Sequence, residues 1–106
     1  MNINEFYSRY AAGQRDFRNL NLMAANLRNL NLKGINLSGA NLTKANLTRT
    51  NLSRANLSGA ILIGANLTET NFTQTNLRDA NLTDTNLADA DLRNAYLSVE
   101  VCEKLK

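Results

Sequence analysis

The chain has 106 residues, of which 43% are hydrophobic and 20% are charged, and it contains no proline, histidine or tryptophan. This size suits one small domain, and the single cysteine excludes an intramolecular disulfide and a thiolate metal cluster. The formal charge of +3 hides a gradient, because eight basic and two acidic residues precede residue 57, whereas four basic and seven acidic residues follow it. No apolar run reaches membrane-spanning length, and the start of the chain lacks a signal-like core. We therefore expect an unexported, cytoplasmic protein without a membrane partner.

The first predicted element is a short amphipathic α-helix over residues 3 to 12. Its apolar residues follow the i, i+3, i+4, i+7 spacing from Ile3 to Tyr10, Asn2 can cap its start, and Gly13 stands where it would end. If the repeat region that follows forms a stack of coils, its first coil exposes unpaired backbone edges that invite aggregation. The helix is therefore expected to cover the first coil of the repeat region that follows.

After this helix, a leucine or phenylalanine recurs every fifth residue in seventeen consecutive units. An asparagine precedes nearly every central residue, the position before that is small or apolar, and two mostly polar or glycine residues follow. The predicted structural core consists of the central residues Phe17, Leu22, Leu27, Leu32, Leu37, Leu42, Leu47, Leu52, Leu57, Leu62, Leu67, Phe72, Leu77, Leu82, Leu87, Leu92 and Leu97.

A period of five matches neither the 3.6 of a helix nor the alternation of a strand, so the backbone must turn once in every unit. If the central residue and the residue two before it both point inward, three residues form a short extended segment and the other two form a corner. Coils stacked at about 4.8 Å can then satisfy one another's amides as parallel strands do. The pattern predicts an all-β solenoid.

Tandem A-N-L-x-x units, such as residues 40–44 and 65–69, resemble the pentapeptide-repeat family over residues 15 to 99. The resemblance implies a right-handed quadrilateral parallel β-helix with four units per coil, and thus about four coils with residues twenty apart in one column. The segment from Tyr10 to Phe17, which leads from the predicted helix into the first repeat, is also similar to that of small cyanobacterial members. The expected organisation is a capping helix in 1–14, the β-helix in 15–99 and a C-terminal cap or tail in 100–106.

This register makes further predictions for the interior and the ends. The bulky Leu20, Leu30 and Ile35 lie in the coils nearest the N-terminal helix and could fill its underside. The stacked asparagines could bond to one another or to neighbouring backbone. At the other end, Ser98 could cap a last helical turn that holds Val101, Cys102 and Leu105, and we expect Cys102 to be a packing residue rather than a reactive thiol.

Catalysis finds little support in the sequence. The chain has no histidine, no glycine-rich phosphate loop and no cluster with metal-ligand spacing, so no enzyme activity, metal or cofactor is predicted. The acidic residues of the second half, Asp79, Asp84, Asp89 and Asp91, fall on outward positions of different units, which favours a solvated surface over a catalytic pair.

One outward site departs from the polar pattern. Ile61 replaces the usual asparagine, Ile63 follows two residues later between Gly59 and Gly64, and Met23 shares the column of Ile63 two coils earlier. Exposed aliphatic residues that cluster often mark contact sites. We therefore predict a non-enzymatic structural or protein–protein interaction module, with Ile61, Ile63 and Met23 as the candidate patch for an unknown protein partner.

Three other functions find less support in the sequence: mimicry of DNA, direct nucleic-acid binding and ice binding. Family members that mimic DNA are long and acidic, whereas this chain is short with a basic front half. Direct nucleic-acid binding through Arg28, Lys33, Lys44, Arg49 and Arg54 lacks an aromatic platform, and these residues are expected to spread around several faces. Regular threonines could bind ice, but the outward columns are mixed. The charge gradient also predicts weak head-to-tail self-association at low salt.

Overall fold

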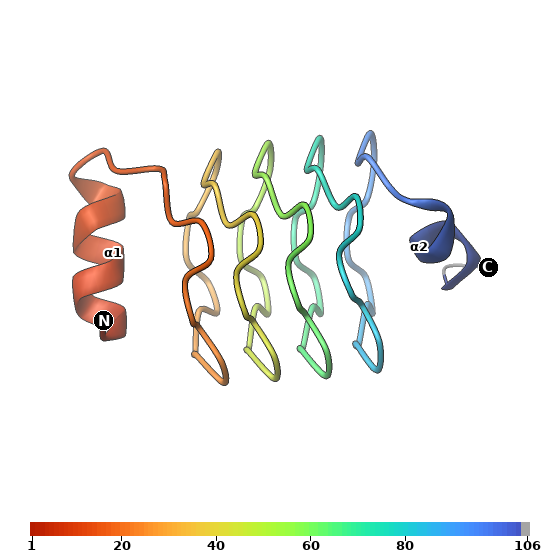
Figure 1. The fold of residues 1–106 in the computed structure, drawn as a ribbon, viewed down its shortest axis with the longest axis horizontal. Helices are drawn as coiled ribbons and strands as arrows, with labels where there is room; N and C mark the ends of the chain where they lie inside the picture. Colours follow the sequence, from red (N-terminus) through yellow and green to blue (C-terminus); the bar gives the residue numbers. More distant parts are fainter. Residues whose placement is uncertain (105–106) are drawn as a thin grey trace.

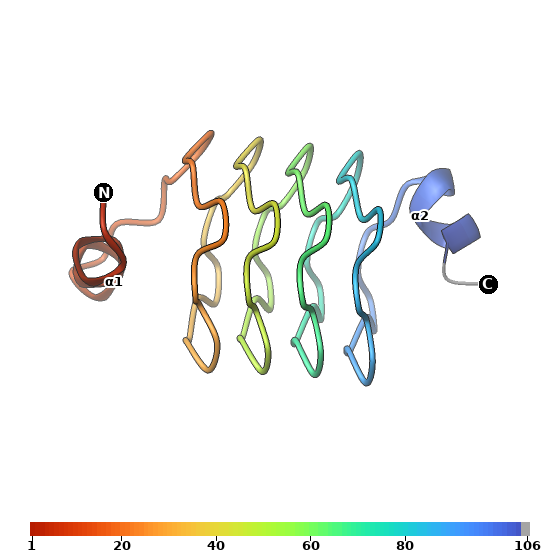
Figure 2. The same cartoon turned by 90° about the horizontal axis from the view of Figure 1, so that it is seen from below.

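The protein is a short rod of stacked coils with a helix at each end, described by a computed structural model over residues 1–104 (Figure 1). Its principal extents are 38 × 23 × 22 Å. Helix α1 spans Ile3–Ala11 and helix α2 spans Val99–Lys104. Figure 2 shows α1 end-on, so its axis crosses the end of the stack at right angles to the rod. The repeat region lies between the two helices.

The coils pair in a strictly regular register of twenty residues. Parallel bridges join asparagine positions of consecutive coils, from Asp16 with Asn36 to Asn76 with Tyr96. Around each bridge the hydrogen bonds run in both directions along the rod. The Leu42 N–H, for example, donates to the Ile61 carbonyl at 2.7 Å in the next coil. One coil therefore contains four five-residue units, and the chain forms a β-solenoid in which each coil satisfies the amides of its neighbours.

Each corner of the coil is a four-residue turn. The N–H of the fourth residue donates to the carbonyl of the central residue, as from Ala45 to Leu42 at 3.0 Å. The third residue of every turn from Asn19 to Asn94 has a left-handed φ between 56° and 73°, whereas the second does not. This combination defines a type II turn, which glycine favours. Most of the third residues are nonetheless not glycine, and Arg49 and Glu69 are examples.

The asparagine before each central residue holds the following turn in place. Asn41 Oδ1 accepts hydrogen bonds from the backbone N–H of Thr43 at 3.1 Å and from its hydroxyl at 2.7 Å. The same bond to the backbone two residues on recurs from Asn21 to Asn86. Of the two roles considered for the asparagines, the structure therefore shows bonding to neighbouring backbone, as in an Asx turn.

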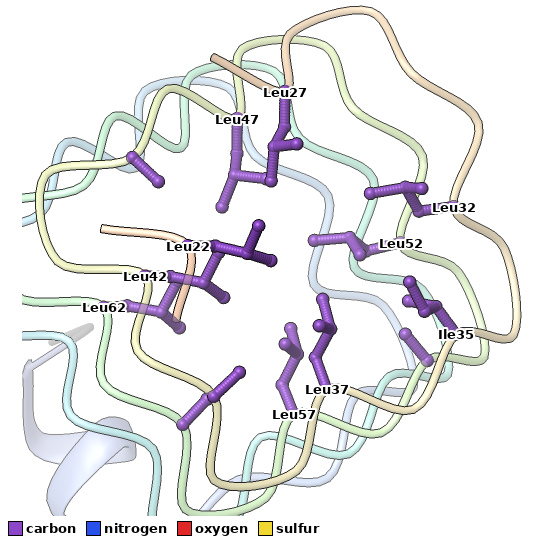
Figure 3. Close-up of a cluster of buried hydrophobic side chains, with 14 of the residues drawn as sticks. Leu22, Leu27, Leu32, Ile35, Leu37, Leu42, Leu47, Leu52, Leu57 and Leu62 are labelled. Atoms are coloured by element: carbon purple, nitrogen blue, oxygen red, sulfur yellow. The ribbon is translucent and has the colours of Figure 1, made fainter. Parts of the chain in front are cut away.

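The central side chains fill the lumen in columns, with Leu22, Leu42 and Leu62 stacked directly along one wall (Figure 3). The central side chains from Phe17 to Leu82 are buried, and mostly small residues two positions before them let the walls approach. Three of these smaller residues are threonines whose buried hydroxyls donate to carbonyls of the preceding coil, Thr50 to Leu27 at 2.8 Å among them. Burial of one leucine contributes about 1.5–3 kcal/mol. The contributions of all buried central residues together stabilise the stack.

Helix α1 packs against the first coil. The rings of Phe6 and Phe17 meet edge-on with centroids 4.9 Å apart, and Ile35 is completely buried in the same cluster. Leu20 and Leu30 pack partly buried against it. The buried face of α1 and the bulky residues of the first two coils thus belong to one hydrophobic cluster.

The last coil is covered less completely. Leu87, Leu92 and Leu97 pack against the core but remain only partly buried, because no further coil follows them and α2 has six residues. These three predicted core residues thus lie half-buried at the end of the stack, whereas the central residues up to Leu82 are buried. Cys102 is exposed on α2, so its predicted packing role is wrong. The expected packing of the Val101 side chain and of Leu105 lies outside the described residues.

Candidate interaction surface

The candidate patch lies on the side of the rod formed by the units of Leu22, Leu42, Leu62 and Leu82. Ile61 forms parallel β-bridges with Asn41 in the preceding coil and with Asn81 in the following coil. It therefore takes the place of an asparagine in a continuous column. Ile61 is 37% exposed, and Ile63 beyond the buried Leu62 is half-buried. The structure therefore places both isoleucines outside the lumen in one unit.

Glycines stand at the corners on both sides of this unit. Gly59 and Gly64 occupy the left-handed position of their turns, with φ of 67° and 70°. A Cβ at Gly59 would meet no neighbouring atom, whereas one at Gly64 would touch Lys44 Cγ at 3.4 Å. The left-handed positions of the two corners that flank Ile61 consequently carry no side chain, whereas Ser58 and Ile63 occupy the second positions of these turns.

The unit with Ile61 and Ile63 also lacks the side-chain hydrogen bonds that asparagine makes to the following turn in the neighbouring coils. At the equivalent places, Asn41 accepts from Thr43 and Asn81 accepts from Thr83, through both the backbone N–H and the hydroxyl. Ile61 and Ile63 have no polar side-chain atoms and make none of these bonds. The fold therefore gains no turn stabilisation from Ile61, and the lumen does not contain it.

Met23, the third predicted member, is separate from the isoleucines. It is 54% exposed and occupies the column of Ile63, but Thr43 lies between them. At the spacing of parallel strands, two coils are about 10 Å apart. The structure brings Ile61 and Ile63 together and leaves Met23 at the edge of the same side.

A hollow of about 530 Å³ opens at the last coil. It is lined by residues 79–84 and by Glu100 of α2, so Asp79, Asp84 and Glu100 make it acidic. No group of three or more acidic, histidine or cysteine residues within the described chain is arranged to hold a metal ion. Neither α1 nor α2 combines the length and apolar character that crossing a bilayer requires.

The repeat pattern and the coil geometry together define the class of protein. The sequence profile of pentapeptide repeats, in eight copies, matches residues 21–59 and 60–98. The chain therefore belongs to the pentapeptide-repeat family.

Solved structures of this family are similar to the chain. A pentapeptide repeat protein from the Arabidopsis thaliana thylakoid lumen has 27% identity and a TM-score of 0.75, with 76% of this chain and 56% of that chain covered. HetL, a pentapeptide repeat protein of Nostoc sp. strain PCC 7120 involved in heterocyst differentiation regulation, has 35% identity and a TM-score of 0.60, with 90% and 48% covered.

A further pentapeptide repeat protein from Nostoc PCC 7120 has 39% identity and a TM-score of 0.54, with 92% of this chain and 87% of that chain covered. The chain thus spans about half the length of the first two of these structures. Among proteins of curated function, none matches the chain by sequence.

Proposed function

We propose that the protein is a non-enzymatic structural module whose isoleucine side, Ile61 and Ile63, binds a protein partner. The observation that carries the proposal is the replacement of a turn-stabilising asparagine by an outward isoleucine between two glycine corners. Family membership supports a scaffold role, because solenoids present extended surfaces for binding. Burial of these two side chains by a partner would recover the hydrophobic free energy that their exposure forgoes.

The proposal includes the finer features of the fold and its setting. We infer the right-handed, four-sided winding of the family, with α1 as its N-terminal cap and a cytoplasmic location. The thylakoid-lumen origin of one similar structure makes fractionation of the native cell a direct test of that location. We also propose weak self-association, driven by the charge gradient along the rod, and sedimentation at two ionic strengths would detect it.

The partner can be sought by affinity purification from the native cell and then tested as a purified protein by calorimetry. The double variant Ile61→Asn with Ile63→Thr restores the consensus pattern, so its melting temperature should be unchanged while binding is lost. As a matched control, Asn66→Ile with Thr68→Ile places the same apolar pair on the next side of the coil. That control should bind the partner as the native protein does. Binding that survives the first double change would remove the isoleucine side from consideration.

A nucleic-acid role is the second candidate, either by mimicry of DNA or through the basic front half. Mimicry needs dense negative charge along the rod, whereas basic residues outnumber acidic ones before residue 57. A gel shift that weakens steeply with added salt would favour direct nucleic-acid binding.

A further inference from the structure

Four cations gather around one side of the first two coils. The turns at residues 28–29 and 33–34 border the side that holds Asn31, and the turns at 48–49 and 53–54 border the same side one coil further. A parallel bridge between Asn31 and Asn51 joins the two coils there. We name this surface the basic face: Arg28, Lys33, Arg49 and Arg54 around Asn31 and Asn51.

This grouping differs from the sequence-based expectation that the basic residues spread over several faces. Only Lys44 of the five residues considered lies at a corner that does not border the basic face. The stacked turns keep the arrangement in register, since the Asn29 N–H donates to the Thr48 carbonyl oxygen at 3.0 Å and the Gly34 N–H donates to the Ser53 carbonyl oxygen at 2.9 Å. The four cations therefore stand at the two corners of one side in a fixed register.

The basic face holds cations that the protein leaves without a counter-charge. Three arginines elsewhere pair with nearby carboxylates: Arg9 with Glu5 at 2.7 Å, Arg18 with Asp16 at 2.9 Å and Arg93 with Asp91 at 2.6 Å. Two others, Arg15 and Arg78, lie over tyrosine rings. Within residues 1–104, by contrast, Arg28, Lys33 and Arg54 form no ion pair. Local positive potential on this side is therefore not cancelled from within the chain.

The remaining cation is only weakly neutralised. Arg49 Nη1 lies 3.6 Å from Glu69 Oε2, and both side chains are about half exposed, where such a pair contributes little. Its Nε donates to Asn29 Oδ1 at 3.2 Å, and Arg54 Nε donates to the neutral Gln74 Oε1 at 2.8 Å. Neutral acceptors orient both guanidinium groups without removing their charge.

The asparagines between the cations add hydrogen-bond donors. Asn31 Oδ1 accepts from the Lys33 N–H at 3.2 Å and Asn51 Oδ1 accepts from the Ser53 N–H at 2.9 Å. Their acceptor oxygens are thus engaged in the turns, while each Nδ2 amide group still carries two donors. A side that offers donors and positive charge suits a ligand that carries anionic acceptors.

We propose that the basic face binds a short, carboxylate-rich segment of a protein partner. Five extended residues reach at most about 17 Å, and two coils rise about 10 Å, so the face is small. Further along the rod Glu69, Asp89 and Asp91 follow, and a long polyanion such as duplex DNA would meet them. Single-stranded nucleic acid would need aromatic platforms, which the described residues of this face lack. Arginine forks match carboxylates in geometry as well as charge.

The test uses a fluorescent peptide of about ten residues rich in glutamate and a glutamine-rich peptide as its neutral counterpart. The variant Arg28→Gln with Lys33→Gln should weaken acidic-peptide binding about tenfold at low salt, since each exposed ion pair contributes up to about 1 kcal/mol. The variant Lys44→Gln with Arg78→Gln removes the same net charge elsewhere and should change the affinity less than about twofold. Equal melting temperatures of the two variants show that folding is unaffected.

Several outcomes would overturn the proposal: no saturable binding of the acidic peptide, equal loss in the two charge variants, or tighter binding of a duplex oligonucleotide through Arg28 and Lys33. This inference goes beyond the isoleucine side, because the basic face is another side of the rod. The Ile61→Asn with Ile63→Thr variant should bind the acidic peptide normally. Failure of the basic face would leave Ile61-dependent binding intact, and the reverse also holds.

Discussion

The Tyr10 hydroxyl donates a hydrogen bond of 2.6 Å to the carbonyl oxygen of Lys33, and this bond ties α1 to the first coil. The Arg15 guanidinium covers the same tyrosine ring at 3.8 Å from its centroid. The helix is therefore held by a specific polar contact in addition to the buried rings of Phe6 and Phe17.

We predict that Tyr10→Phe lowers the free energy of unfolding by about 1 kcal/mol, because it removes one hydrogen bond and keeps the ring. Urea denaturation followed by circular dichroism would measure the change. Tyr7→Phe is the matched control, since Tyr7 stacks on Tyr10 and no hydrogen bond of its hydroxyl occurs in the described chain. Equal effects of the two substitutions would contradict the role given to the Tyr10 hydroxyl.

The lumen predicts different costs for chemically identical truncations. Leu57→Ala removes a fully buried side chain between two complete coils and should destabilise the protein by about 2–5 kcal/mol. Leu97→Ala removes a partly buried side chain at the open end and should cost less, because solvent can fill the space. Chemical denaturation of both variants checks this order, and a larger loss at Leu97 would refute it.

The left-handed turn position predicts sensitivity to β-branched residues. Ala24 has a φ of 58°, so Ala24→Val should cost roughly 1–2 kcal/mol through backbone strain. Ala88 is also exposed but lies at the second position of its turn, where φ is not positive. Ala88→Val is therefore expected to be nearly neutral. Thermal melting compares the two, and similar shifts would argue against strain as the cause.

The pair of Asp91 and Arg93 predicts a pH-dependent contribution to stability. Hydrogen bonds from Arg93 lower the pKa of Asp91 below its ordinary 3.8. A carboxyl with a lowered folded-state pKa adds stability above its unfolded pKa, and this contribution is lost as the pH falls through the folded value. Asp91→Asn keeps an amide oxygen for the turn bond to the Arg93 N–H, so the charge is the main loss.

The native protein should therefore exceed Asp91→Asn in stability at pH 7, and the difference should vanish near pH 2, as urea midpoints would show. Asp84→Asn serves as a control, because the Asp84 carboxylate has no ion pair in residues 1–104. A difference between native protein and Asp91→Asn that persists undiminished in acid would exclude the ion pair as its source.

The sequence predicted the solenoid because each unit repeats the same inward leucine, and one regular register explains them all. It could not show that Leu87, Leu92 and Leu97 stay partly buried, since burial at an end depends on what lies beyond the last coil. Cys102 was misassigned for a related reason, because an apolar-looking residue on a six-residue helix need not face the stack.

For the candidate surfaces, the isoleucine side was visible as a break in the asparagine column, so Ile61 could be found from the pattern alone. The basic face was missed because Arg28 and Arg49 occupy different positions within their units. They become neighbours only when coils are superposed with a twenty-residue period. The left-handed φ of residues such as Arg49 was equally hidden, because the turn imposes it regardless of residue type.

The division of each coil into four five-residue units has a consequence for how such a chain can change. Insertion of a single unit would rotate everything downstream by a quarter turn and move Ile61 out of line with Asn41, while the lumen would still be filled. Insertion of four units would lengthen the rod by one coil, about 4.8 Å, and leave every side aligned. Growth by whole coils therefore preserves binding geometry, and growth by single units redistributes it.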